Sequence, residues 1–181
     1  MNLSDQESLL PNYQKKEISS LLGQYKYEWV DNAYKFTTEF GYTYSVYFLT
    51  KARCLYAEYE HWRDWVYEMG FEVVGRLPKD HRYDERVTDT ILCIIDTFFS
   101  TKENVLLYTC ESLDDGGELR YRLFNQWYFK SGKKEEFEKL DYDASFEDTK
   151  IFTTMIFARN HPYEVEISDA FFWVCQEIYN Y

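Results

Sequence analysis

The sequence is poor in residues that cross-link a chain, bend it or carry it through a membrane. Its 181 residues include seven glycines, three prolines and four cysteines, and no two cysteines have the CxxC spacing of a metal or redox site. Scattered cysteines in apolar segments indicate free thiols in a reducing compartment. No stretch reaches the roughly 18 apolar residues of a membrane helix, and acids within the first seven residues argue against a signal peptide. We therefore expect a cytoplasmic protein.

Basic residues are also scarce. The chain has 20 Lys and Arg against 32 Asp and Glu, which gives a formal net charge of −12. Because nucleic-acid binding depends on neutralising phosphates, direct contact with DNA or RNA is not expected, and the same reason argues against anionic membranes. In one interpretation the negative charge only serves solubility. In the other, an acidic face meets a basic protein partner.

Signatures of catalysis are missing as well. There is no GxSxG elbow for a nucleophilic serine, and most of the cysteines lie in segments that predict burial. The histidines, at positions 61, 81 and 161, fall in separate loop-like contexts, and His161 in the sequence NHP is typical of a turn. The DxD-like pair Asp141 and Asp143 is too common a pattern to indicate a metal. We predict no catalytic residue, no metal site and no cofactor, and we expect a protein that is not an enzyme.

Aromatic side chains, by contrast, are abundant. The chain has 18 tyrosines and 14 phenylalanines, which favour strands because their rings fit a pleated, half-buried surface. With so few glycines and prolines, dense packing and short connections are expected. Part of the tyrosine is expected at the surface, where an amphipathic ring is a good contact for a protein partner.

Alternation of apolar and polar residues predicts strands in the first half of the chain. Residues 1–23 are polar and are expected to form a loose arm or one short helix. From Tyr25 to Phe48 the period is two, which predicts a three-stranded antiparallel meander. Residues 51–64 fit either a short helix or an irregular excursion. Residues 65–77 alternate again and predict a fourth strand, with Trp65 on the same side as Tyr67, Met69, Phe71 and Val73.

Helices and strands follow one another in the second half. Residues 84–102 carry the clearest helical stripe, with Asp84 as the N-cap. Two further helical stripes follow, in which Leu119 and Ile178 are among the residues expected to face the core. The strands between them are a central one covered on both faces, an edge strand and a core strand, at residues 104–110, 137–144 and 151–158.

Together these patterns predict one α+β domain. Strands gather early in the chain and helices are mixed with strands later, which is typical of that class. We predict a single domain over residues 24–181, with a mainly antiparallel sheet of about six strands packed with about three helices. No internal repeat or linker divides it.

One polar cluster is the best candidate for a functional site. The DDGG turn, residues 114–117, lies between a strand and a helix but lacks the glycine spacing of a phosphate loop, and its acids would repel a phosphate. The plainer interpretation is that an Asp caps the helix. Of the two arginines on that helix, at least one is expected to lie on a solvated face or to pair with a local acid, while Arg120 could face the start of the neighbouring helix. The candidate residues are Asp84, Arg86, Thr90, Glu111, Asp114 and Arg120, with a structural salt-bridge network as the alternative.

A series of short motifs carries a family resemblance. The motifs are D-x-R before T-I-x-x-I-I-x-x-F-F, then Y-x-C-[DE]-S, an arginine-bearing helix that ends in Trp, and N-x-P. Through residues 84–129 and 157–171 the chain resembles an uncharacterised bacterial family, domain-of-unknown-function family 6169. The resemblance implies a single α+β domain without an established activity, and it identifies no catalytic residue.

Three functional hypotheses follow. The first is a non-enzymatic protein that binds a partner, possibly basic, through an acidic, tyrosine-rich surface, as antitoxins, immunity proteins and inhibitors do. The alternative is an enzyme or nucleotide-binding regulator that uses the candidate cluster, with a divalent metal offsetting the acids. The third is a self-associating protein with a tyrosine-lined two-fold contact, which would make it a homodimer.

Overall fold

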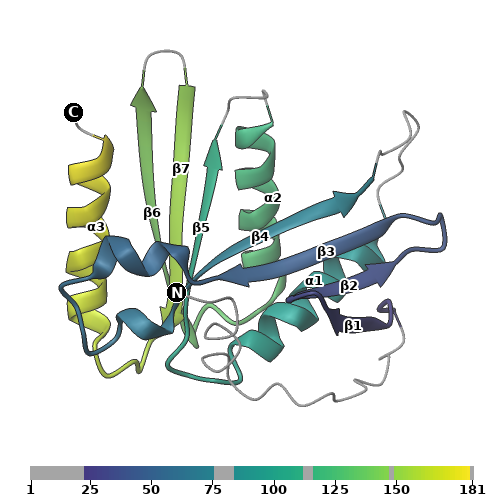
Figure 1. The fold of residues 1–181 in the computed structure, drawn as a ribbon, viewed down its shortest axis with the longest axis horizontal. Coiled ribbons are helices and arrows are strands. Elements are labelled where there is room, and N and C mark those ends of the chain that lie inside the picture. The colour runs from purple at the N-terminus through teal and green to yellow at the C-terminus, as the bar shows by residue number, and fades with distance from the viewer. Residues whose placement is uncertain (1–22, 76–83, 112–115, 147–148, 180–181) are drawn as a thin grey trace.

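The computed structural model describes residues 23–75, 84–111, 116–146 and 149–179. Seven strands form one sheet in the order β1-β2-β3-β4-β5-β7-β6. Helices α1 and α2 pack against one face of this sheet, and α3 packs against the other (Figure 1). The predicted α+β class is therefore confirmed, with one strand more than expected. The predicted N-terminal arm lies outside the described residues.

The first four strands form the antiparallel meander that the alternation predicts. They are β1 (Tyr27–Val30), β2 (Ala33–Thr37), β3 (Thr43–Leu49) and β4 (Val66–Val74). Each pairs antiparallel with its neighbour. The β1–β2 turn consists of Asp31 and Asn32, both at positive φ, a conformation that Asp and Asn tolerate better than other side chains and that two-residue hairpin turns require.

The second half of the sheet surrounds a central strand. Strand β5 (Val105–Glu111) pairs parallel with β4 and antiparallel with β7 (Thr149–Ala158), and β6 (Phe137–Phe146) forms the edge beyond β7. Leu106 and Tyr108 of β5 enter the core under α1 and α2, while Val105 and Leu107 enter the core under α3. A strand buried on both faces has a continuous apolar run in its sequence, as β5 does. The predicted central, edge and core strands are all confirmed.

Helix α1 (Glu85–Phe98) follows the stripe predicted for it. Asp84 is the N-cap, and its side chain accepts a hydrogen bond from Arg86 N at 3.0 Å. Ile91, Ile94 and Phe98 are almost fully buried against the sheet. The helix links β4 to the parallel strand β5, as a parallel crossover requires.

The segment after β3 is irregular, which is one of the two forms that its sequence fits. It contains two short 3-10 helices, η2 (Lys51–Tyr56) and η3 (Arg63–Trp65). Trp62 is fully buried and packs under α3, whereas Leu55 is exposed. Trp65 lies in η3, just before β4, and joins the core under α3 instead of lying on the predicted side of the fourth strand.

Helices α2 (Gly117–Lys130) and α3 (Glu164–Tyr179) bury most of their predicted stripes, with one error at the end of each. Leu119 is exposed in the first turn of α2 and Ile178 is exposed in the last turn of α3. Among the described residues, no helix is long and apolar enough to cross a membrane.

Candidate functional site

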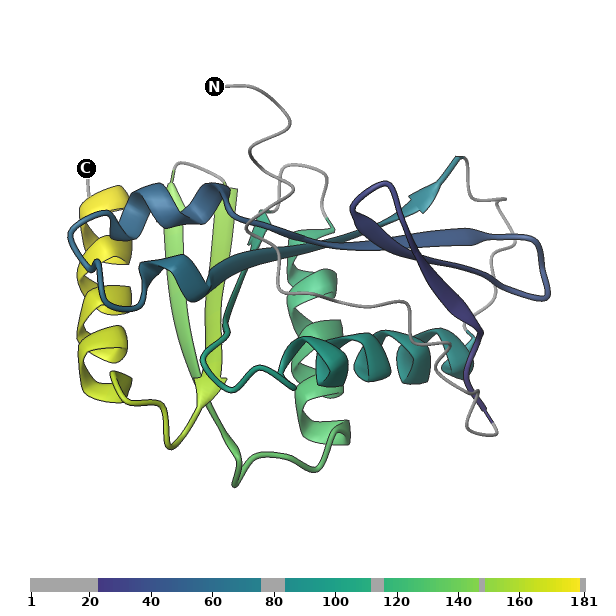
Figure 2. The same ribbon diagram turned by 60° about the horizontal axis from the view of Figure 1, so that its bottom comes forward.

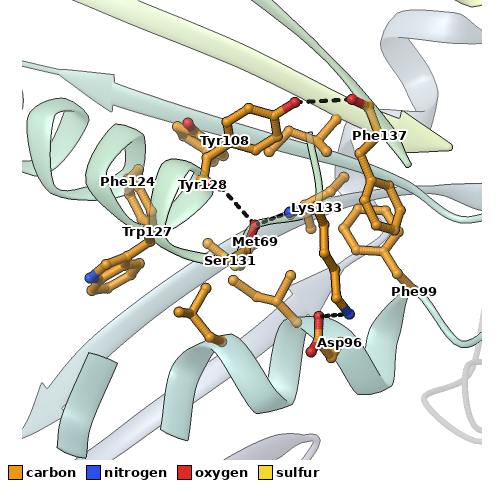
Figure 3. A pocket seen from close by; sticks show the side chains of 14 residues that line it. Met69, Asp96, Phe99, Tyr108, Phe124, Trp127, Tyr128, Ser131, Lys133 and Phe137 are labelled. Carbon is orange, nitrogen blue, oxygen red and sulfur yellow. Dashed lines mark hydrogen bonds and ion pairs between the residues drawn. The ribbon is translucent and has the colours of Figure 1, made fainter. Parts of the chain in front are cut away.

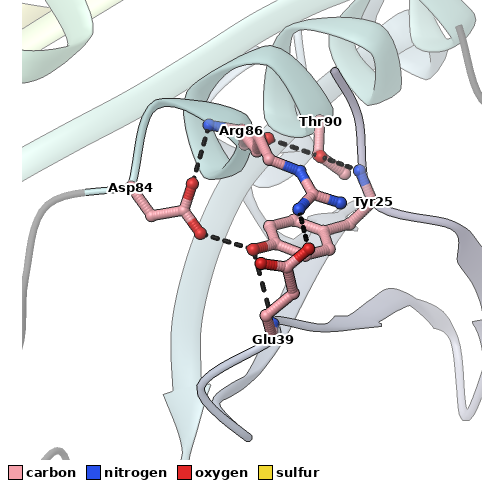
Figure 4. Close-up of polar contacts among 5 residues, drawn as sticks. All are labelled: Tyr25, Glu39, Asp84, Arg86 and Thr90. Carbon is pink, nitrogen blue, oxygen red and sulfur yellow. Dashed lines mark hydrogen bonds and ion pairs between the residues drawn. The ribbon is translucent and has the colours of Figure 1, made fainter. Parts of the chain in front are cut away.

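Three of the predicted site residues meet at the start of α1, against the segment that precedes β1 (Figure 4). Asp84 caps the helix and also accepts a hydrogen bond from the Tyr25 hydroxyl at 2.5 Å. Thr90 accepts a hydrogen bond from the backbone N of Tyr25 at 2.9 Å and donates one to Arg86 O at 2.6 Å. The two side chains therefore hold residue 25 against α1.

Arg86 completes this network through contacts with Tyr25 and Glu39. Its guanidinium lies 4.0 Å from the centre of the Tyr25 ring and forms an ion pair with Glu39 in the β2–β3 turn. Burial raises the pKa of Tyr25, and the hydrogen bond to Asp84 raises it further. Asp84, Arg86 and Thr90 thus all have partners within the chain. We call this network a structural lock, because it joins α1 to the β2–β3 turn and to the segment before β1.

The other predicted residues lie elsewhere. Glu111 ends β5, and its carbonyl oxygen accepts a hydrogen bond from Arg120 Nη2 at 2.7 Å. Asp114 lies outside the described residues. The starts of α1 and α2 are well apart in Figures 1 and 2, so the described candidate residues form two groups and not one pocket.

Two expectations about the start of α2 have different outcomes. The N-cap is Gly116, and the two aspartates that precede it, Asp114 and Asp115, lie outside the described residues, so the expected Asp cap stays a prediction. Arg122 does pair with a local acid, Glu118, at 2.5 Å. Across the described parts of the chain, no group of three or more His, Cys, Asp or Glu side chains could hold a metal ion.

An interior cavity lies between α1, α2 and the sheet (Figure 3). It measures about 50 Å³ and is lined mainly by apolar side chains, with Trp127 and Met69 among them. An ion pair of 2.7 Å between Lys133 and Asp96 closes one side. This volume suits one or two water molecules and is smaller than the roughly 150 Å³ of a cavity that holds benzene, so the cavity is a packing defect.

The tyrosines belong to the core more than to the surface. Six are buried, among them Tyr56 and Tyr108, and no tyrosine among the described residues has an exposed fraction of 36% or more. The expected tyrosine-rich surface is thus limited to partly covered rings. The exposed aromatic residues of the described chain are instead Phe40, Phe129, Phe172 and Trp173.

Helix α3 combines exposed apolar side chains with a single sign of charge. Val165, Phe172 and Trp173 are exposed to 74%, 40% and 49%. At 100° per residue they fall on the side of the helix opposite to its buried face. The helix carries four acids and no Lys or Arg, and Glu166, Asp169 and Glu177 lie beside the exposed apolar residues. We call Val165, Glu166, Asp169, Phe172, Trp173 and Glu177 the α3 outer face.

An open cleft adjoins the N-terminal end of this face. It has a volume of about 660 Å³, and its lining includes Tyr59, Tyr163, Glu164, Glu166 and Asp169 but no Lys or Arg. Trp62 Nε1 donates a hydrogen bond to Glu166 Oε2 at 3.1 Å, which fixes that carboxylate at the border between cleft and outer face. The cleft therefore extends the acidic and aromatic character of the α3 outer face.

The α3 outer face was not predicted from the sequence, because a helical stripe identifies only the side of the helix that faces the core. The stripe of α3 that faces the core consists of Ile167, Ala170, Phe171 and Val174, and all four are buried. The missed signal was a second set of apolar residues on the opposite side, at spacings of seven and eight from Val165. A helix with apolar residues on two sides needs two partners.

The comparisons with known proteins concern the second half of the chain. A family model described as a family of unknown function matches residues 83–172. This segment resembles DUF6169. The DUF6169 match begins next to the N-cap of α1 and ends within α3, so it includes both groups of candidate residues, Phe172 and most of the acids of the α3 outer face. No curated protein and no solved structure matches the chain.

Proposed function

We propose that the protein is a non-enzymatic, cytoplasmic binding module that holds a basic protein partner on the α3 outer face. The observation that carries the proposal is the exposure of Phe172 and Trp173 on a helix that has acids and no bases. Exposed aromatic side chains are the usual anchors of protein interfaces. Surrounding charges of one sign select a partner of the opposite sign and speed its association.

The adjoining cleft adds to this surface. A Lys or Arg side chain of the partner could lie against the rings of Tyr59 and Tyr163 and meet the carboxylates of Glu166 and Asp169, which line the same cleft. A cation that contacts both an aromatic ring and a carboxylate gains more than it would from either alone. A partner with an exposed basic segment next to an apolar patch would complement both parts of the surface.

A second copy of the chain is a poorer occupant. In a two-fold contact each α3 outer face would present its three acids to the same three acids of the other copy, and like charges placed opposite each other oppose association. The enzyme or nucleotide-regulator alternative gains no support from the α1 network, because Asp84, Arg86 and Thr90 all have partners within the chain.

Capture from the native host tests the proposal. The bait would be used as the wild type, as the double variant Phe172→Ala/Trp173→Ala, and as the control Phe40→Ala, which removes an aromatic side chain of 57% exposure from the β2–β3 turn. We expect a stoichiometric basic protein that is recovered by the wild type and the control and is lost with the double variant or at high salt. Equal recovery by all three baits, or no stoichiometric partner, would refute the proposal.

A further inference from the structure

A second cleft lies between α2 and the edge strand β6, on the face of the sheet opposite to α3. Its volume is about 430 Å³, within the range of small-molecule sites. Aromatic rings and opposite charges share its walls. The lining residues are Tyr121, Asn125, Tyr128, Phe129, Glu138, Lys139, Asp141 and Arg159.

Lys139 is the unusual residue of this cleft. Its side chain is only 7% exposed, although it lies on an edge strand, and it forms an ion pair with Asp141. The ammonium group lies 5.6 Å from the centre of the Tyr121 ring and 5.9 Å from that of Tyr128. Burying a charge is costly even when it is paired. An inward-pointing charge on an edge strand can serve to block strand pairing, but that role needs no cleft beside it.

The Tyr108 hydroxyl lies behind this ion pair and has no hydrogen-bond partner among the described residues. Tyr108, Thr154 and Asp141 are neighbours across β5, β7 and β6. Thr154 donates a hydrogen bond to Asp141 at 2.6 Å, whereas the buried Tyr108 hydroxyl has no hydrogen-bond partner in the described structure. Burial raises the pKa of Tyr108, the adjacent Thr154 hydroxyl lowers it, and the Asp141 carboxylate raises it, so the Tyr108 hydroxyl lies near both Thr154 and Asp141. A buried polar group without a partner is rare and calls for an explanation.

The charges of the cleft favour an uncharged ligand. Lys139 is paired with Asp141, and Arg159 is paired with Glu138. An anion would have to compete with the two carboxylates, and a cation with Lys139 and Arg159. A neutral compound with hydroxyl groups can bind both members of each pair without separating them, since a hydroxyl both donates and accepts. The rings of Tyr121 and Phe129 offer apolar surface to the faces of a ring-shaped ligand.

We propose that this cleft binds a monosaccharide ring, either free or at the end of a glycan. The ring contacts the aromatic side chains, and its hydroxyls bond to Asn125 and to the Lys139–Asp141 pair. Tyr108 lies behind the cleft and does not line it, so its hydroxyl gains a partner through a water molecule held between it and the ligand. Weak binding is expected, with dissociation constants of roughly 0.1–10 mM, because the site is open and the ligand small.

The test is a titration of the whole chain with glucose, galactose, mannose, N-acetylglucosamine and their methyl glycosides, followed by amide NMR shifts. At least one sugar should shift signals of α2 and β6 and leave α3 unchanged. Tyr108→Phe should weaken that sugar about tenfold without lowering the melting temperature, because it removes a hydroxyl that has no partner in the free protein. Asn125→Ala should also weaken binding, and Glu60→Gln, an exposed position on the other face, should not.

Binding of a methyl glycoside as tight as that of the free sugar would assign the site to a glycan end, and loss of binding on methylation would assign it to the free sugar. No shift at α2 and β6 with any probe at 20 mM or so would overturn the proposal. Shifts that Tyr108→Phe and Asn125→Ala both leave unchanged would overturn it as well.

Discussion

Replacing Thr90 with valine tests whether the network at the start of α1 is a structural lock. Thr90 is fully buried, and its hydroxyl both accepts from Tyr25 N at 2.9 Å and donates to Arg86 O at 2.6 Å. Valine has nearly the same volume, so the substitution leaves no cavity. Arg86 O keeps the amide of the next helical turn as a donor. The Tyr25 amide, however, loses its acceptor.

The expected cost follows from that one amide. A buried donor left without a partner costs about 1–3 kcal/mol, and for a chain of this length each kcal/mol lowers the melting temperature by about 2–4 °C. A loss of about 2 kcal/mol and a shift of roughly 4–8 °C are therefore expected. The free energy of unfolding would be measured by urea denaturation followed by far-UV circular dichroism.

Thr97→Val on the same helix is the matched control. The Thr97 hydroxyl donates to Cys93 O at 2.9 Å and lies 3.4 Å from the Tyr27 hydroxyl, which also contacts Cys93 Sγ. No backbone amide of the described residues donates to it, so a loss below about 1 kcal/mol is expected. If Thr90→Val lay within about 0.5 kcal/mol of the wild type, or cost no more than Thr97→Val, the network would not be a lock and the assignment of these residues to structure would be refuted.

Two pH effects follow from buried groups. Burial raises the pKa of Cys110 to about 11 and of Cys175 to about 12, whereas unfolded thiols ionise near pH 8.5. The free energy of unfolding should therefore fall as the pH rises from about 8.5 to 11. A free energy of unfolding that stays constant over this range in urea titrations would contradict this. Burial lowers the pKa of His161 below 6.5, so its contribution to stability is complete above pH 6.5 and is lost as the pH falls. Its Nδ1 accepts from Tyr163 N and its Nε2 faces Glu103 O, so ¹⁵N NMR should show a neutral ring protonated at Nε2; a titration midpoint above 6.5 would be inconsistent with these contacts.

The sequence was informative where periodicity and burial coincide. The stripe from Val87 to Phe98 fits only a helix with one buried side, and the continuous apolar run of β5 fits a strand buried on both faces. Both elements and their order could therefore be predicted. The segment between β3 and β4 could not be assigned because Trp62 reaches the core from an irregular backbone. No local period encodes a side chain that is buried by contacts more than 100 residues away, such as its hydrogen bond to Glu166.

The candidate sites illustrate the same limit. Asp84 could be predicted as a cap because capping is local, but its link to Tyr25 depends on where the chain before β1 returns. Lys139 and Asp141 look like ordinary surface residues of an edge strand, and only the packing of α2 over β6 encloses them. The exposure of Phe172 and Trp173 likewise depends on which face of α3 the sheet covers.

The most direct test of the binding function is the affinity of the captured partner for variants of the α3 outer face, measured by isothermal titration calorimetry. Trp173→Ala should cost at least about 2 kcal/mol of binding energy, roughly 30-fold in dissociation constant. The free energy of unfolding of this variant should change little, because Trp173 is 49% exposed. Glu166→Gln/Asp169→Asn should weaken binding mainly at low salt. Binding by all these variants with the affinity of the wild type and of Phe40→Ala would contradict the account.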